Sequence, residues 1–225
     1  MHEVKKTPDV FLIDQQETRG LSADGIERAR RSLMRRDPRI GALIRRAGRC
    51  HLAEGRRADP FASLVRVILS QQLSVGAANT IHGRVVALAG GASALTPARL
   101  LSFDPASLRA VGVSGPKVTY LRDLAIRVAD GRLDLPSLEW LSDDDVVEAI
   151  TSVKGLGRWS ADMFLIFRLN RPDVWPVGDL GIVKGVQKLF EMRRPPALRT
   201  LQRVAKPWRP YRSVAAWYLW RIHEL

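Results

Sequence analysis

Val153-Lys154-Gly155-Leu156-Gly157-Arg158 lies between two stretches of helical periodicity, and the fold depends on this segment. Two glycines flank one apolar residue, so the backbone can turn tightly and another backbone can come close. The first amides of the following helix then point outward, where they can bind an anionic phosphate. The alternative is an ordinary helical corner with a glycine cap. The basic residue and the small pair Ser160-Ala161 that follow favour the phosphate site.

Helical periodicity extends outward from this segment over most of the chain. Apolar residues recur at helix spacing over 26–34, 40–47, 61–69 and 74–89, and again over 146–150 and 182–190. Ser142, three residues before Asp145, has the placement of a helix N-cap. Almost no alternating strand pattern is present. The sequence therefore predicts an all-α fold with short loops.

The charge of the chain indicates its class of partner. Among 225 residues, 36 Lys and Arg stand against 23 Asp and Glu, giving a formal net charge of +13 and a pI of about 10.9. Such a balance favours nucleic acid or an anionic membrane. No apolar run approaches the roughly 20 residues that a membrane span needs, and the run at 10–13 is too short for a signal peptide. We therefore expect a protein that lies with nucleic acid in the cytoplasm.

The reactive residue types exclude several kinds of site. The single cysteine, Cys50, excludes a disulfide framework and a four-cysteine cluster. The four histidines show no paired metal-ligand spacing. We therefore expect neither an organic cofactor nor a catalytic metal.

Four blocks of the chain resemble one family. The segment 153–164 resembles the helix-hairpin-helix of base-excision DNA glycosylases, and Trp175-Pro176-Val177-Gly178-Asp179-Leu180-Gly181 resembles their Gly/Pro-rich loop, which ends in a catalytic aspartate. Segments 68–74 and 208–220 also match. The closest branch is the 3-methyladenine DNA glycosylase II family, in its short form without an N-terminal β-domain, and the resemblance covers roughly 59–220.

The resemblance implies a fold and a domain organisation. It implies two helical lobes flanking a DNA-binding cleft. Residues 1–58 would form an N-terminal arm, loose over 1–20, and a helical extension. Residues 59–225 would form the glycosylase domain, with its C-terminal helices packed against the N-terminal helices as one lobe. The implied partner is double-stranded DNA containing damaged bases, bound by a monomer.

Asp179 is the candidate catalytic residue. Its local pattern is that of a helix N-cap, which is compatible with a fixed, ionised carboxylate. Such a group near C1′ of the sugar stabilises positive charge and can orient or deprotonate water. Asp162 and Asp173 are weaker candidates. Strand-cleaving relatives carry a lysine at the position of Trp159, so we expect base removal without strand cleavage.

The resemblance also implies the remaining site residues. Gln72 and Leu73 would fill the gap left by a flipped base, the alternative being a helix end with a buried leucine. Trp159, Trp220 and Met163 would form the base pocket, although an aromatic helix is more often core. The hairpin contacts to DNA would come from Lys154, Gly155, Leu156, Gly157, Arg158 and Ser160. Backbone carbonyls of Thr151, Val153 and Leu156 would hold a structural Na⁺ or K⁺.

These features predict a monofunctional glycosylase for alkylated bases. Two other functions stay open: a glycosylase that also cleaves the strand, and a non-catalytic DNA-binding protein. No His or Glu lies between the hairpin and Asp179 to serve as a general acid. We therefore expect cationic bases, 3-methyladenine and 7-methylguanine, to be released more readily than neutral hypoxanthine.

Overall fold

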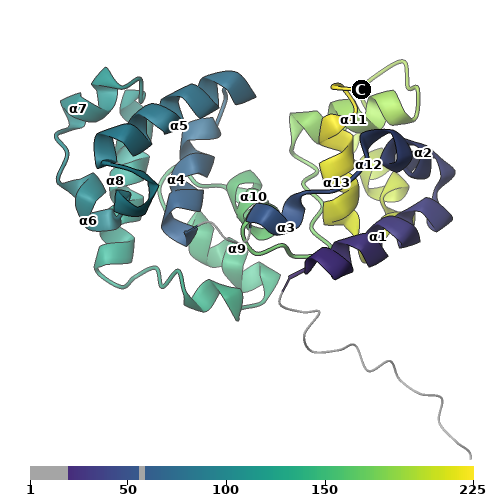
Figure 1. The fold of residues 1–225 in the computed structure, drawn as a ribbon, viewed down its shortest axis with the longest axis horizontal. Coiled ribbons are helices and arrows are strands. Elements are labelled where there is room, and N and C mark those ends of the chain that lie inside the picture. Colours follow the sequence, from purple (N-terminus) through teal and green to yellow (C-terminus); the bar gives the residue numbers. More distant parts are fainter. Residues whose placement is uncertain (1–19, 56–58) are drawn as a thin grey trace, which may run out of the picture.

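The computed structural model describes residues 20–55 and 59–225. Within them, all regular elements are helices, and Figure 1 shows these helices gathered into two lobes joined by the region of α3 and α10. The prediction of an all-α fold with two lobes is confirmed. The predicted loose arm falls, apart from Gly20, outside the described residues. No helix among the described residues is long and apolar enough to cross a membrane.

One lobe contains the central part of the chain. Helix α4 is its centre, because it packs on α5, α8 and α10, and buried residues at helix spacing, such as Leu64 and Ile68, line the packed face. Helix α6 packs on α8, and α9 packs on α10. The elements of this lobe are α4 (Pro60–Ser70), α5 (Val75–Ala89), η2 (Ala92–Ala94), α6 (Pro97–Leu101), α7 (Pro105–Ala110), α8 (Gly115–Ala129), η3 (Ser137–Glu139), α9 (Asp143–Thr151) and α10 (Arg158–Phe167).

The other lobe brings the two ends of the described chain together. Helix α13 packs on α11, α2 and α1 (Figure 1). The Trp208 indole donates to the carboxylate of Asp37 over 3.0 Å, and both side chains are buried. Short helix α3 (Leu52–Gly55) packs on α1 and α10. The elements of this lobe are α1 (Ala23–Arg36), α2 (Pro38–Ala47), α11 (Leu180–Leu189), α12 (Leu198–Val204), η4 (Lys206–Trp208) and α13 (Arg212–Arg221).

Side-chain caps explain where several helices begin. Ser142 accepts from the amide of Asp145 over 3.2 Å, which confirms the predicted N-cap of α9. Asp59 and Ser74 cap α4 and α5 in the same way, at 2.9 and 3.3 Å. The helical periods expected over 26–34, 40–47, 61–69, 74–89, 146–150 and 182–190 correspond to α1, α2, α4, α5, α9 and α11. The sequence pattern missed α3, η2, η3 and η4, which are too short to show a period.

Candidate active site

The carboxylate of Asp179 accepts hydrogen bonds from residues of three helices. It caps α11, because its Oδ1 accepts from the Ile182 amide over 2.9 Å. The indole of Trp159, on α10, donates to Oδ2 over 2.7 Å. The indole of Trp220, on α13, donates to Oδ1 over 2.8 Å. The carboxylate is therefore fixed by one helix amide and two indoles, and charge-assisted hydrogen bonds of this kind are the stronger ones.

The approach of Trp220 to Asp179 requires a small residue beside the aspartate. A Cβ built on Gly181 would lie 2.7 Å from Cδ1 of Trp220 and 3.0 Å from Oδ1 of Asp179. An alanine at this position would therefore push the indole away from the carboxylate. The sequence alone gave no indication of this contact.

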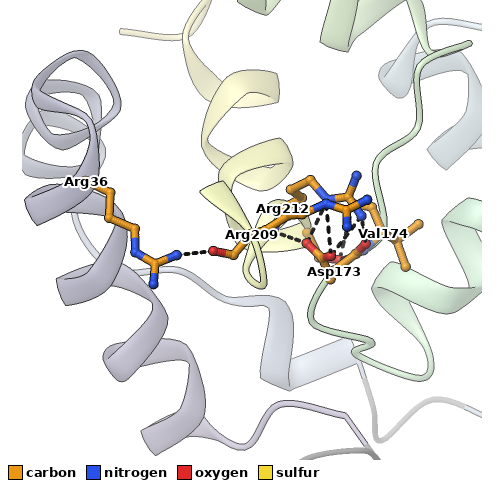
Figure 2. Close-up of polar contacts among 6 residues, drawn as sticks. Arg36, Asp173, Val174, Arg209 and Arg212 are labelled. Atoms are coloured by element: carbon orange, nitrogen blue, oxygen red, sulfur yellow. Dashed lines mark hydrogen bonds and ion pairs between the residues drawn. The ribbon is translucent and has the colours of Figure 1, made fainter. Parts of the chain in front are cut away.

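Hydrogen bonds hold the loop that leads to Asp179 against α13. Arg212 donates from Nε to Oδ1 of Asp173 over 2.7 Å and from Nη2 to Oδ2 over 2.8 Å (Figure 2). The amide of Val174 donates to Ser213 Oγ over 2.9 Å, and Arg36 of α1 bonds the carbonyl of Arg209 beside this cluster. Asp173 thus has a structural partner, which agrees with its low rank as a catalytic candidate.

A largely apolar pocket of about 440 Å³ opens between α4 and α10. Trp159 forms part of its wall and also binds Asp179, so the pocket adjoins the carboxylate. Met163 lines it as well, together with Ser63, Arg66, Val67, Ser70, Phe164, Phe167 and Arg168. The size suits one flat aromatic ligand.

Trp220 differs from its predicted position. It is not part of the lining of this pocket. Instead its ring stacks on Phe167, with centroids 5.3 Å apart and planes at 28°. Its indole N–H donates to Asp179, so Trp220 holds the carboxylate and also packs against Phe167, which lines the pocket.

A second hollow, of about 720 Å³, is a cleft between the lobes. Its walls come from α9 and α10, from the loop before Asp179, and from Gln202 and Arg212 of the other lobe. Trp159 lines both this cleft and the apolar pocket, and therefore stands between them. The arrangement offers an elongated ligand a cleft along Trp159 and the loop that leads to Asp179, with a side pocket for a single ring.

The hairpin has the backbone shape that its glycines predict. Gly155 has φ +77°, and a Cβ on it would lie 2.2 Å from Cδ2 of Tyr120. Leu156 is buried at 4% exposure, as expected for the residue that fills the turn. Gly157 stands at the N-cap of α10 without a side-chain cap, so the first amides of that helix have no side-chain acceptor there. Uncapped amides of this kind at a helix N-terminus can bind an anion.

The charged residues of the hairpin do not contribute equally. The Lys154 side chain is exposed, and its backbone amide donates to Asp123 over 2.9 Å. Arg158 instead pairs with Asp162 over 2.8 Å, so part of its charge is neutralised inside the protein. Burial raises the pKa of Asp162, and the Arg158 guanidinium opposes that shift. Lys154 is therefore the stronger candidate for a phosphate contact.

Asp123 anchors the hairpin from α8. Burial alone would raise the pKa of its carboxyl, but hydrogen bonds from the Lys154 amide and the Arg127 guanidinium outweigh burial and hold the pKa below its ordinary value. The Arg127 bond is 2.8 Å long. This carboxylate lies far from the hairpin in sequence, and no local pattern indicated its role.

The two predicted wedge residues project from the end of α4. Gln72 is exposed with φ +57°, and Leu73 is 40% exposed, so the alternative of a buried leucine is wrong. One neighbour that the sequence did not single out holds this loop. Lys117 donates to the carbonyls of Leu69 and Gln71, each over 2.8 Å.

Gln71 links the wedge loop to the hairpin. Its amide donates to the carbonyl of Gly155 over 2.8 Å and lies 3.3 Å from Oγ of Ser160. Ser160, predicted to contact DNA, is buried at 2% exposure and serves this internal link. A phosphate on the hairpin and a wedge in the duplex would therefore be held by one connected set of residues.

Comparisons with known proteins agree with this geometry. The model of the HhH-GPD superfamily of base excision DNA repair proteins matches residues 65–210. DNA-3-methyladenine glycosylase 1 of Schizosaccharomyces pombe is 34% identical over 168 residues, 74% of this chain and 74% of that protein. The structure of S. pombe 3-methyladenine DNA glycosylase (Mag1) in complex with abasic DNA has a TM-score of 0.80 at 32% identity, covering 88% of this chain and 97% of that one. A DNA-3-methyladenine glycosidase from Bacillus halodurans has a TM-score of 0.72 at 39% identity, covering 86% of this chain and 88% of that one.

Proposed function

The chain belongs to the HhH-GPD superfamily of base excision DNA repair proteins, and we propose that it is a monofunctional DNA glycosylase for alkylated bases. It flips the damaged base out of duplex DNA and hydrolyses the N-glycosidic bond. The observation that carries this proposal is the carboxylate of Asp179, held by two indoles and a helix amide at the junction of a ring-sized pocket and an inter-lobe cleft.

The two carboxylate oxygens of Asp179 accept different numbers of hydrogen bonds. Oδ1 accepts from the Ile182 amide and from Trp220, whereas Oδ2 accepts from Trp159. A carboxylate oxygen can accept about two hydrogen bonds. Among the described residues, Oδ2 therefore retains capacity, and we assign the attacking water to it.

The reaction follows from that placement. The C1′–N bond breaks, its electron pair leaves with the base, and positive charge develops on the sugar. The fixed carboxylate stabilises this charge, and Oδ2 takes a proton from the water that adds to C1′. Adenine methylated at N3 or guanine methylated at N7 carries positive charge in DNA, so it leaves as a neutral molecule and is attracted to the face of Trp159.

Hydrolysis by water, rather than attack by a lysine, is supported by the residues around Asp179. Trp159 occupies the position of the lysine in strand-cleaving relatives, and its indole N–H is engaged by the carboxylate. Among the described residues, neither the apolar pocket nor the inter-lobe cleft is lined by a lysine. Borohydride should therefore trap no covalent complex on damaged DNA. A stoichiometric Schiff base would instead establish the lyase.

The decisive test of the catalytic role is Asp179→Asn. Because the variant removes the negative charge, base release should fall by about a hundredfold or more. Binding to abasic-site DNA should persist, because the hairpin amides are unchanged. Asp24→Asn, on the exposed first turn of α1, removes the same charge away from both hollows and serves as the control. Near-normal release by Asp179→Asn would remove the residue from its role and leave a DNA-binding protein as the alternative.

DNA is the partner of this fold, and we propose that the chain acts on it as a monomer in the cytoplasm, with no organic cofactor or catalytic metal. Sedimentation with a short duplex would give the stoichiometry. We further propose a structural Na⁺ or K⁺ at the hairpin. The carbonyls of Thr151 and Leu156 accept no hydrogen bond within the described part of the chain, whereas that of Val153 accepts one from the Leu156 amide at 3.1 Å. Neutral carbonyls of this kind fit a monovalent cation, whose charge would favour a phosphate nearby.

A further inference from the structure

The pocket beside Asp179 contains two arginines that aromatic stacking does not require. Arg66, on α4, and Arg168, at the C-terminal end of α10, both line it. Arg168 is half-buried, and its Nε is a buried atom with no hydrogen-bond partner in the described residues. This Nε is covered by protein atoms, so the donors that Arg168 can offer a ligand are the N–H groups of its two Nη atoms.

The other polar groups of the pocket do not offer a donor. The hydroxyls of Ser63 and Ser70 each donate to a carbonyl of their own helix turn, over 2.8 Å. Arg66 donates through Nη2 to Asn79 over 2.8 Å, but a guanidinium has five N–H groups, so others remain. The two guanidiniums are thus the donors available to a base in this pocket.

No carboxylate lines this pocket or forms an ion pair with either arginine within the described residues. His82 lies near Arg66, and burial together with the charge of Arg66 lowers its pKa, so this imidazole is neutral near pH 7 and adds no charge. The positive charge of the pocket therefore comes from the two guanidiniums, and Asp179 is not among the residues that line it. A base that already carries positive charge is repelled by these arginines, and a neutral base with acceptor atoms is not.

We propose that Arg168 and Arg66 are specificity-determining residues that extend excision to neutral bases with carbonyl or ring-nitrogen acceptors. This inference rests on the proposed glycosylase function. It revises the expectation of a pocket made by Trp159, Trp220 and Met163, in which no general acid assists a neutral leaving group.

The chemistry explains why a guanidinium suits a neutral base. When its C1′–N bond breaks, a neutral base departs with the electron pair and becomes negatively charged. A guanidinium cannot give up its proton at neutral pH, but its N–H groups stabilise that charge by hydrogen bonding. Water adds to C1′, its proton passes through Asp179 to solvent, and solvent protonates the released base. A cationic base leaves neutral and gains nothing from these donors.

The test is a ratio of two single-turnover rates under saturating enzyme. One duplex carries hypoxanthine, which is neutral and has carbonyl and ring-nitrogen acceptors, and the other carries 7-methylguanine in the same sequence. Arg168→Met keeps most of the stem and removes the charge. It should lower hypoxanthine release about tenfold to a hundredfold, the value of a hydrogen bond to a charged group. It should raise 7-methylguanine release about two- to tenfold, because a like charge is lost.

Three further variants control the measurement. Arg168→Lys, which keeps the charge but loses the planar fork, should recover part of the hypoxanthine rate. Arg66→Met should shift the ratio in the same direction and carries the test if Arg168→Met fails to fold. Arg45→Met, on the exposed face of α2 in the other lobe, removes the same charge and should leave the ratio at its wild-type value.

The outcomes separate this inference from the function on which it rests. An equal fall for both bases would mean that the arginines contact phosphates, and would overturn the proposal. Release of 7-methylguanine by the wild-type protein without measurable release of hypoxanthine would also overturn it, while leaving the glycosylase function intact. Release of no base from either duplex would instead defeat the proposed function itself.

Discussion

Replacing each hairpin glycine with alanine should separate the shape of the hairpin from its contact with DNA. Gly155 and Gly157 are two residues apart, yet their surroundings are opposite. At Gly155 the backbone has φ +77° and a new Cβ would lie 2.2–2.4 Å from three atoms of the Tyr120 ring. At Gly157 the backbone is extended, with φ −114° and ψ −172°, and a Cβ would meet nothing of the protein within 4 Å.

The expected loss of stability at Gly155 can be worked from these distances. An alanine in the left-handed region costs about 1–2 kcal/mol. Moving the half-buried Tyr120 ring out of contact resembles overpacking a core, which costs about 1–3 kcal/mol. Together they lower the free energy of unfolding by about 2–5 kcal/mol. For a chain of this size, that corresponds to a fall in Tm of about 5–15 °C.

Gly157→Ala should behave in the opposite way. Because the backbone there suits any residue, Tm should stay within about 2 °C of the wild type. The new methyl group stands beside the first amides of α10, where we place a phosphate, so affinity should fall about tenfold for damaged and undamaged duplexes alike.

Two measurements decide the matter: thermal unfolding without DNA, and duplex affinity at a fixed salt concentration below the Tm of each variant. Gly155→Ala combined with Tyr120→Ala should show a coupling of about 1–3 kcal/mol, since the ring is the main obstacle. A wild-type Tm for Gly155→Ala would refute the strain at the turn. If Gly157→Ala lowered Tm as much as Gly155→Ala does and left duplex affinity unchanged, the assignment of the phosphate to the α10 amides would be refuted.

Three other expectations follow from the site. Asp123→Asn should lower the free energy of unfolding by about 1–3 kcal/mol at pH 7; because the folded pKa of Asp123 is depressed, the difference from wild type in Tm should shrink as pH falls below about 4, towards that folded pKa. Lys154→Ala should weaken binding equally for all duplexes and reduce the slope of log affinity against log salt by about one, as seen in a salt titration; an effect confined to one lesion would contradict a phosphate contact. Leu73→Ala should slow base release from paired duplexes more than from duplexes with a mismatched lesion, measured in single turnover, since a wedge matters most where the stack resists opening; equal slowing would argue against it.

The hairpin, the helix caps and the position of Asp179 at the start of a helix could all be predicted from the sequence. Each depends on residues within about four positions along the chain, where helix geometry places partners together whatever the rest of the protein does. The left-handed turn at Gly155 and the cap by Ser142 are of this kind. So is the pair Arg158–Asp162, whose i,i+4 spacing would have shown that Arg158 is engaged.

The partners of these residues were decided only by how the helices pack. Trp159 and Trp220 reach Asp179 from different helices, and the family resemblance implied a base pocket rather than hydrogen bonds to the carboxylate. The same holds for Lys117, which secures the wedge loop, and for Arg168, which ends in the pocket with a buried, unpartnered Nε. A sequence pattern specifies which face of a helix is apolar. It does not specify which distant face that helix meets, because this choice depends on the combined packing of both lobes.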